Sequence, residues 1–372
     1  MLGCGNSNAV HKVREIGENL MQKNARILLL DGISQIPVGR DIKDGFQLEN
    51  YDVSYLDLKK IAKKSFYKLR RIFDKAVNYS RSNDEYYYYP KASNELIRAI
   101  RDIQPTMVFV IGFFFPFLER DVFLELKKEM GFQLFLFDTD SGGMLENYKK
   151  LIYFFHYELP LYDQIFSFSK SMTQMMNRLG LSQAQFFPFG SKLITQRSSA
   201  KKYDACFIGT PGVRRIFYLE TLKDCNITIR GWRWKQFRSL ISPELWKKIN
   251  PESLWGEALY DLLGQTKIVL NITSPFWHAV ETGMNLRVFE TLAMQEFLLT
   301  DFCEELKEMF KIGEEMEVFH STEELVDKVH FYAKHDNERD KIALAGHEKF
   351  LQGYTWEQRV KLLMHAVRDV KD

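Results

Sequence analysis

The clearest α/β pattern in this chain lies in Asn271–Asp301, which reads NITSPFWHAVETGMNLRVFETLAMQEFLLTD. An apolar strand ends at Asn271, and a loop that contains Gly283 follows it. The spacing of apolar residues then predicts a helix over Leu286–Met294 and a second buried strand over Phe297–Thr300. A helix between two apolar strands is the repeating unit of a parallel sheet covered on both faces. This stretch therefore assigns the chain to the α/β class.

The same alternation of strands and helices extends through both halves of the chain. Short apolar runs predict buried strands at Ile27–Leu30, Met107–Phe113, Leu134–Phe137, Gln164–Phe168, Gln185–Phe189, Ala205–Ile208, Ile227–Ile229 and Ile268–Ile272. Helical spacing predicts helices at Leu58–Val77, Asn94–Ile103, Leu118–Met130, Gly143–Phe155, Ser171–Leu179, Val213–Leu222, Leu254–Leu263, Thr322–Ala333, Glu338–Leu351 and Trp356–Val370. No sequence motif recurs, so the repeat is one of architecture.

A polar segment separates two domains. Residues 190–203 are rich in Ser and Lys and lack periodicity, which is typical of a linker. We therefore expect a Rossmann-like domain over residues 1–190, a linker over 191–203 and a second Rossmann-like domain over 204–355. The C-terminal helix, residues 356–372, is a candidate to cross back to the first domain. Two consecutive parallel-sheet domains direct the carboxyl ends of their strands into a cleft between them.

The composition is that of a globular protein and excludes several other classes. Hydrophobic residues make up 45% of the chain and charged residues 27%, which excludes a disordered protein. The 51 basic and 49 acidic side chains nearly balance, so no overall charge favours a nucleic-acid partner. The longest uncharged run, Ile103–Leu118, has 16 residues, fewer than the roughly 20 that a membrane-spanning helix needs.

The N-terminus and the cysteines indicate a cytoplasmic protein. Met1–Leu20 has no continuous apolar stretch, so we expect no secretory signal. The cysteines lie far apart and lack C-x-x-C spacing, which favours reduced thiols over a zinc site or a disulfide framework. They are Cys4, Cys206, Cys225 and Cys303.

An anion-binding loop is the first candidate functional feature. The segment Phe207–Arg215, FIGTPGVRR, leads from a predicted strand into a helix that begins near Val213. Glycines let backbone N–H groups approach an anion closely, and the start of a helix favours negative charge. Arginine side chains in the first helical turn can bind a diphosphate by charge-assisted hydrogen bonds. The candidates are Gly209, Thr210, Gly212, Arg214 and Arg215. The alternative is an ordinary strand–helix turn with two solvated arginines.

A second candidate lies at the start of the helix over Leu286–Met294. Glu290 can accept hydrogen bonds from both vicinal hydroxyls of a ribose, while the backbone N–H groups of Met284–Leu286 can bind phosphate oxygens. The structural alternative is a carboxylate that stabilises the helix N-terminus.

At this point the residues resemble a known family. The motif G-x-N-x-R-x-F-E over Gly283–Glu290, with Asn271 before it and FLLTD over Phe297–Asp301 after it, resembles the group 1 glycosyltransferase domain of the CgeB-like spore-maturation proteins. The similarity covers nearly all of residues 203–370. Further matching segments are Phe207–Arg215, Gly231-Trp232, Gly313–Glu315, Ser321–Leu325, the His335 and Arg339 region, Tyr354–Trp356 and Arg359.

The resemblance implies a GT-B fold, with a sugar nucleotide bound by the C-terminal domain and an acceptor bound by the N-terminal one. Glu290 matches the ribose-binding glutamate of the family, and Arg214 or Arg215 matches its phosphate-binding basic residue. Asn285 and Arg287 then lie beside the diphosphate. The expected partners are a UDP-, GDP- or dTDP-sugar donor and a hydroxyl acceptor on a glycan, a lipid or a protein.

The stereochemistry and the cofactor requirement follow from the same resemblance. Many retaining relatives carry a second glutamate eight positions before the ribose glutamate, whereas this chain has Thr282 there, with Glu281 beside it. The resemblance implies retention of configuration, and Thr282 is a departure from the retaining pattern. We expect no metal or other cofactor to be required, because arginines and N–H groups can stabilise the departing diphosphate.

The segment Asp138-Thr139-Asp140 follows an apolar strand and allows three interpretations. An Asp-x-Asp sequence after a strand holds a metal–diphosphate in the GT-A fold. In the GT-B interpretation Asp138 or Asp140 positions or deprotonates the acceptor hydroxyl, and we rank this above a metal site. The structural alternative is a pair of strand-end aspartates in a turn or helix cap.

Histidines and tryptophans supply further candidates. His278 lies between Trp277 and the Gly283 loop and is a candidate contact of the donor, whereas His156 is expected to be packed or on the surface. Three tryptophans can stack on a base or a sugar, with buried packing as the alternative. They are Trp232, Trp234 and Trp255.

Leu58–Val77 predicts a basic amphipathic helix, because eight Lys or Arg residues accompany one Asp. Such a helix can contact anionic lipid at the inner membrane face, or it can be an outer helix of the sheet with a solvated face. The acidic stretch over Glu304–Glu317 is expected to be solvated. Two other functions stay open: a sugar-nucleotide epimerase of the same architecture, and a non-catalytic scaffold at a membrane surface.

Overall fold

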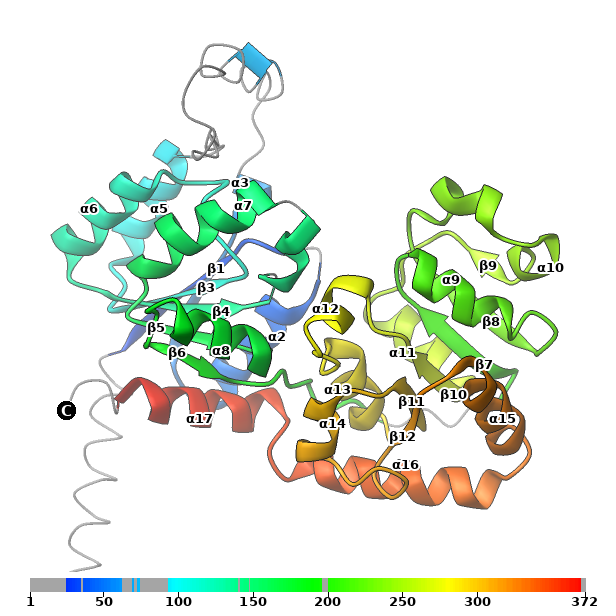
Figure 1. Ribbon diagram of the computed structural model, residues 1–372. Coiled ribbons are helices and arrows are strands. Elements are labelled where there is room, and N and C mark those ends of the chain that lie inside the picture. The colour runs from blue at the N-terminus through cyan, green and yellow to red at the C-terminus, as the bar shows by residue number, and fades with distance from the viewer. Residues whose placement is uncertain are drawn as a thin grey trace, which may run out of the picture.

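The computed structural model describes residues 25–34, 36–61, 69, 72–73, 93–139, 141–146, 148–195 and 200–368. Within this part of the chain, two six-stranded sheets lie side by side, and every pair of neighbouring strands is parallel (Figure 1). The predicted α/β architecture of two parallel-sheet domains is confirmed.

The N-terminal sheet has the strand order β2-β1-β3-β4-β5-β6. Its strands are β1 (Arg26–Asp31), β2 (Asp52–Asp57), β3 (Met107–Ile111), β4 (Gln133–Asp138), β5 (Gln164–Ser167) and β6 (Ala184–Phe186). Its helices are α2 (Val38–Leu48), α3 (Leu58–Ile61), α5 (Ser93–Ile103), α6 (Arg120–Met130), α7 (Tyr148–Tyr153) and α8 (Lys170–Arg178). All residues of β3 are buried, because helices cover both faces of the sheet.

The C-terminal sheet has the order β12-β11-β10-β7-β8-β9. Its strands are β7 (Tyr203–Ile208), β8 (Ile227–Arg230), β9 (Ile249–Asn250), β10 (Thr266–Asn271), β11 (Leu298–Asp301) and β12 (Glu317–Phe319). The first helices of this domain are α9 (Val213–Glu220), α10 (Pro243–Trp246), α11 (Glu257–Gly264), α12 (Pro275–Ala279) and α13 (Leu286–Ala293). They continue with α14 (Glu304–Met309), α15 (Thr322–Tyr332), α16 (Asp336–Leu351) and α17 (Trp356–Arg368).

The C-terminal helix α17 returns to the N-terminal domain and packs against α2 (Figure 1). The chain crosses between the domains at two adjacent places, because the N–H of Ser191 donates to the carbonyl of Tyr354 and the N–H of Trp356 donates to the carbonyl of Ser191, each over 3.0 Å. A Cβ atom on Gly45 would lie 2.9 Å from the carbonyl oxygen of Trp356, so α2 and α17 approach closely at this glycine. One apolar cluster continues through this contact from one domain into the other.

Several elements differ from the sequence-based expectation. The strand β2 and the helix α2 were not predicted, because the edge strand carries polar residues between apolar ones and α2 contains Gly39 and Gly45. The predicted helix over Gly143–Phe155 is wrong in detail, since a 3₁₀ turn over Gly142–Glu146 precedes α7 and a π-helical turn over Phe154–Glu158 follows it.

The predicted basic helix over Leu58–Val77 begins as α3, but most of its residues lie outside the described part of the chain. Its described residues Leu69, Ile72 and Phe73 are exposed. Among the described helices, none combines the length and the apolarity of a membrane-crossing segment. The acidic stretch is only partly solvated, because Glu305 and Glu317 are buried.

Candidate functional site

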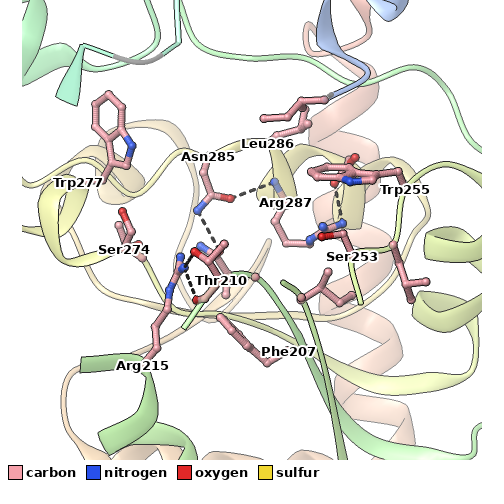
Figure 2. Close-up of a pocket in the computed structure, with 18 of the residues that line it drawn as sticks. Phe207, Thr210, Arg215, Ser253, Trp255, Ser274, Trp277, Asn285, Leu286 and Arg287 are labelled. Atoms are coloured by element: carbon pink, nitrogen blue, oxygen red, sulfur yellow. Dashed lines mark hydrogen bonds and ion pairs between the residues drawn. The ribbon is translucent and has the colours of Figure 1, made fainter. Parts of the chain in front are cut away.

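A pocket of about 770 Å³ opens where the carboxyl ends of β7, β8, β9 and β10 face the N-terminal domain (Figure 2). This is the position at which parallel α/β sheets bind ligands. The C-terminal domain supplies most of its wall, and the N-terminal domain adds Ile36 and Phe168. The other lining residues are Phe207, Ile208, Gly209, Thr210, Arg215, Gly231, Trp232, Ser253, Leu254, Trp255, Asn271, Thr273, Ser274, Trp277, Thr282, Asn285, Leu286, Arg287 and Glu290.

The predicted anion loop forms one side of this pocket. Gly209 and Thr210 line it, and the guanidinium of Arg215 lies beside them. Nε of Arg215 donates to the carbonyl of Ile272 over 2.8 Å, and Nη1 donates to the carbonyl of Thr210 over 2.8 Å and to its Oγ1 over 3.2 Å (Figure 2). Burial lowers the pKa of Arg215 to about 10, so it remains a cation at neutral pH. The loop therefore presents a fixed positive charge to the pocket.

The neighbouring residue Arg214 has a different environment. Its Nη1 forms an ion pair with Oδ2 of the buried Asp301 over 2.6 Å and donates to the carbonyl of Thr273 over 3.2 Å. Arg214 does not line the pocket, and neither does Gly212, which is the N-cap residue of α9. We therefore expect Arg215 to face a diphosphate in preference to Arg214, because the charge of Arg214 is already paired with Asp301.

Glu290 and Arg287 form a buried pair in the wall of the pocket. Nη1 of Arg287 donates to Oε2 of Glu290 over 2.6 Å, and both residues are less than 10% exposed. Burial raises the pKa of Glu290, and the charges of Arg287 and Lys192 counteract this. Nε of Arg287 is buried and has no hydrogen-bond partner in the described part of the chain. An unsatisfied donor beside a carboxylate equips this wall to bind a polar ligand.

A chain of amide side chains fixes the start of α13. Nδ2 of Asn285 donates to Oδ1 of Asn271 over 2.9 Å, and Nδ2 of Asn271 donates to Oγ1 of Thr300 over 2.9 Å. Oδ1 of Asn285 accepts from the N–H of Arg287 over 3.0 Å as the N-cap of the helix. This network accounts for the asparagines at 271 and 285, whereas Arg287 contributes only its backbone N–H to it.

The prediction that the backbone N–H groups of Met284–Leu286 are free to bind phosphate is wrong in part. The N–H of Asn285 donates to the carbonyl of Gly283 over 2.9 Å, so it is not free to bind phosphate. Gly283 and Met284 do not line the pocket, and the side chain of Met284 is fully buried. Leu286 does line it.

The aromatic candidates separate into exposed and buried groups. Trp232 is 50% exposed and Trp255 is 41% exposed, and both line the pocket. Trp234 is fully buried and its Nε1 donates to the carbonyl of Gly209 over 3.0 Å, so it supports the anion loop and the stacking role suggested for it is wrong. Trp277 and Trp255 lie at opposite ends of the pocket, with Asn285 and Arg287 between them (Figure 2).

The histidine candidates and Glu281 lie outside the pocket. His278 is on α12, and its Nδ1 lies 3.9 Å from Oδ2 of Asp301, so its predicted contact with the donor is not supported. His156 is exposed, as predicted. Glu281 is exposed, whereas Thr282 is buried and lines the pocket. Glu281 therefore does not replace the second glutamate of the retaining relatives.

Asp138 is held in a turn and does not line the pocket. Its Oδ1 accepts from the N–H of Ser141 over 3.0 Å, and its Oδ2 accepts from Oγ of Ser141 and from Oγ of Ser167. The residue is fully buried, so the prediction that it serves the acceptor is wrong and the strand-end turn is correct. Asp140 lies outside the described residues. Among those that are described, no group of three or more His, Cys, Asp or Glu side chains is placed to hold a metal ion.

Several lining residues were not predicted from the sequence. Ser253 and Ser274 follow or precede short elements that lack a distinctive pattern, and Ile36 and Phe168 belong to the other domain. Trp277 was recognisable only as a neighbour of the Gly283 loop. These residues share no motif, since the fold of the C-terminal domain and its packing against the N-terminal domain bring them together.

Asp41 on α2 is a buried carboxyl group within electrostatic reach of Glu290. Burial raises its pKa to about 7, Lys192 lowers it and Glu290 raises it. Because the pKa in the folded state exceeds the ordinary aspartate pKa of 3.8, the folded protein binds the proton more tightly, so this group's contribution to stability falls as the pH rises from about 4 to about 7.

Asp41→Asn is therefore expected to raise the melting temperature at pH 8 by about 2 °C, a gain of about 1 kcal/mol, and to change it little at pH 4. Thermal unfolding between pH 4 and pH 8 measures the difference. Asp52→Asn, at an exposed position of β2, is the control and should leave the pH dependence of stability unchanged. Parallel wild-type and Asp41→Asn curves would contradict the assignment.

Comparison with solved structures identifies the fold. HepE from Anabaena, determined in complex with UDP-glucose, superposes with a TM-score of 0.62 at 8% identity, covering 92% of this chain and 99% of that one. Sucrose-phosphate synthase from Thermosynechococcus elongatus superposes with a TM-score of 0.61 at 10% identity, covering 93% of this chain and 99% of that one. A glycosyltransferase from Rickettsia africae superposes with a TM-score of 0.57 at 9% identity, covering 94% of this chain and 99% of that one. The chain has the GT-B fold of these enzymes.

Comparison of the sequence with protein families matches a shorter part of the chain than the structural comparison does. Residues 214–365 match a family described as glycosyl transferase-like. No curated protein sequence matches the chain. The glycosyltransferase resemblance of the C-terminal half is thus supported, and the closer resemblance to CgeB-like proteins stays a prediction.

Proposed function

We propose that this protein is a glycosyltransferase that transfers a sugar from a nucleoside diphosphate to a hydroxyl acceptor. The observation that carries the proposal is the convergence of Arg215, Arg287 and Glu290 on one interdomain pocket at the carboxyl ends of the strands. A cation, an unsatisfied donor and a carboxylate in one cavity match the diphosphate and the ribose hydroxyls of a sugar nucleotide.

The donor extends along the pocket. Its diphosphate lies against Thr210 and Arg215, and its ribose hydroxyls donate to Glu290. Its base lies toward Trp232 and Trp255, whose exposed rings offer stacking surfaces. The sugar then lies at the Trp277 end, beside the N-terminal domain from which the acceptor enters. Crystal structures of HepE contain UDP and UDP-glucose, which supports UDP as the nucleotide.

The proposed role of Arg215 in sugar transfer follows from the charge that develops in the transition state. As the bond from the sugar to phosphate breaks, the sugar becomes oxocarbenium-like and the departing diphosphate gains negative charge. A guanidinium that is already held by protein carbonyls stabilises this charge without reorganising, so it stabilises the transition state more than the ground state. The same charge stabilisation supports independence of a metal cofactor, and the family resemblance is the basis on which we propose retention of configuration. The cytoplasmic location and the membrane contact of residues 58–77 stay predictions.

The proposal is tested by titration calorimetry of the full chain with UDP, GDP, dTDP and uridine. We expect micromolar affinity for one diphosphate and much weaker binding of the nucleoside, because the anion loop recognises the diphosphate. Absence of binding by all three diphosphates would overturn the proposal. Release of the diphosphate from the matching sugar nucleotide that increases with an added hydroxyl acceptor separates transfer from epimerisation, which turns over the donor alone.

A further inference from the structure

The loop that precedes α13 is held by both domains. This loop, Thr282–Asn285, is called the donor loop below. Oγ1 of Thr282 lies 2.5 Å from Oγ of Ser169, which is the N-cap residue of α8 in the N-terminal domain. Both side chains are buried, and Thr282 lines the pocket. A buried hydrogen bond therefore joins the two domains at the edge of the donor site.

Glu305 forms a second connection between the same two elements. Its Oε1 accepts from the backbone N–H of Lys170, at the start of α8, over 2.6 Å. Glu305 is 5% exposed, and its Oε2 has no hydrogen-bond partner within the described residues. Burial raises the pKa of this carboxyl group to about 7, and the backbone N–H groups of Lys170, Gly283 and Met284 lower it. The carboxyl group thus faces the backbone of both domains.

The donor loop also packs directly on the helix that carries Glu305. A Cβ atom on Gly283 would lie 2.5 Å from Sγ of Cys303, the residue that precedes α14, and 3.6 Å from Leu306. The side chain of Met284 is fully buried beside them. Figure 1 shows α12, α13 and α14 on the side of the C-terminal domain that faces α8. The donor loop therefore cannot shift without moving α14 or the contact with α8.

We propose that Glu305 is a positioning residue, which together with the Ser169–Thr282 hydrogen bond holds the donor loop in its binding arrangement when the two domains are closed. The inference rests on the proposed function, since it concerns how a sugar nucleotide is bound. Glu305 does not line the pocket. It acts through Gly283 and Met284 on Asn285, whose side chain caps α13 and contacts Asn271.

The exposed ion pair nearby does not explain this connection. Lys170 also pairs with Glu308, but the two side chains are 40% and 53% exposed. Exposed ion pairs contribute little, because water and salt screen them. Glu305 is buried and its Oε1 accepts the N–H of Lys170 from the other domain, so removing the carboxylate leaves that donor unsatisfied. The larger effect is therefore expected at Glu305.

The first experiment compares Glu305→Ala and Glu305→Gln with Glu304→Gln, the preceding residue on α14, which is 60% exposed. UDP affinity is measured by titration calorimetry, and the radius of gyration is measured by X-ray scattering with and without UDP. We expect Glu305→Ala to bind UDP about tenfold more weakly and to be more expanded without it. Glu305→Gln should be intermediate, because its amide oxygen can still accept the N–H of Lys170. Glu304→Gln should stay within about twofold of the wild type.

The second experiment is a double-mutant cycle on UDP affinity with Ser169→Ala and Thr282→Val. The two changes should be non-additive, because each removes the same hydrogen bond. UDP affinity of folded Glu305→Ala within about twofold of the wild type would overturn the proposal. If Glu305→Ala does not fold, the same criterion applies to Glu305→Gln and Ser169→Ala.

A failure of the proposed function gives a different result. In that case the wild type binds no nucleoside diphosphate, and the scattering measurement alone decides whether Glu305 connects the domains. Equal radii for the wild type and Glu305→Ala would then overturn this inference as well. A larger radius for Glu305→Ala would support the connection and leave only the identity of the ligand wrong.

Discussion

Glu290→Ala is expected to weaken the binding of UDP about a hundredfold, because the ribose loses two hydrogen bonds to a charged acceptor. The carboxylate is 3% exposed and lies in the wall of the pocket, with one oxygen paired to Arg287. Titration calorimetry of the wild type and the variant at one pH measures the effect.

A ligand variant distinguishes this role from a structural one. The wild type should bind 2′,3′-dideoxy-UDP much more weakly than UDP, whereas Glu290→Ala should bind the two equally. Glu281→Gln, an exposed change nine positions before Glu290, should retain the discrimination. If Glu290→Ala still prefers UDP over its dideoxy analogue, the ribose does not lie at this carboxylate.

Arg215→Met is expected to lower kcat for transfer about a hundredfold, because one preorganised donor to the departing charge is lost. The same change should abolish most of the preference for UDP over uridine. Arg215 is held by the carbonyls of Ile272 and Thr210, so a shorter or more flexible cation cannot reproduce its position. Steady-state kinetics and calorimetry with UDP and uridine give the two readouts.

Arg214→Met is the informative comparison, because the two arginines are adjacent on α9. Its loss leaves the buried Asp301 without its cation, so we expect a lower melting temperature and an unchanged ratio of UDP to uridine affinity. A result in which Arg214→Met removes the preference for UDP and Arg215→Met does not would reverse the assignment of the phosphate-binding residue.

The sequence predicts the class of fold well, because continuous apolar runs have few alternatives to buried parallel strands. The strand β3 shows this, since every residue in Met107–Ile111 is buried. The edge strand β2 has half-buried residues and lacks that signal. Short elements such as β9 and α12 depend on their surroundings for stability, so their own sequences do not predict them.

The candidate site could be located from the sequence, but its side chains could not all be assigned. Successive residues on a helix point about 100° apart, so two adjacent arginines leave the helix in different directions. Which of them faces the pocket depends on Asp301, 86 positions after Arg215. Asp138 was predicted to contact the acceptor, but it is buried and forms hydrogen bonds to Ser141 in a turn and to Ser167 on a neighbouring strand. Such partners become visible only in three dimensions.

The paired crossings at Ser191 and Tyr354–Trp356 restrict how the two halves of the molecule can move. Because two hydrogen-bonded segments connect the halves side by side, we expect the halves to rotate about this line and not to slide apart. With α17 anchored on α2, the axis lies beside the N-terminal sheet, and displacement increases with distance from it. Small changes in the backbone torsions of residues 190–192 and 353–356 would thus give larger displacements at the pocket, because the pocket lies farther from the axis.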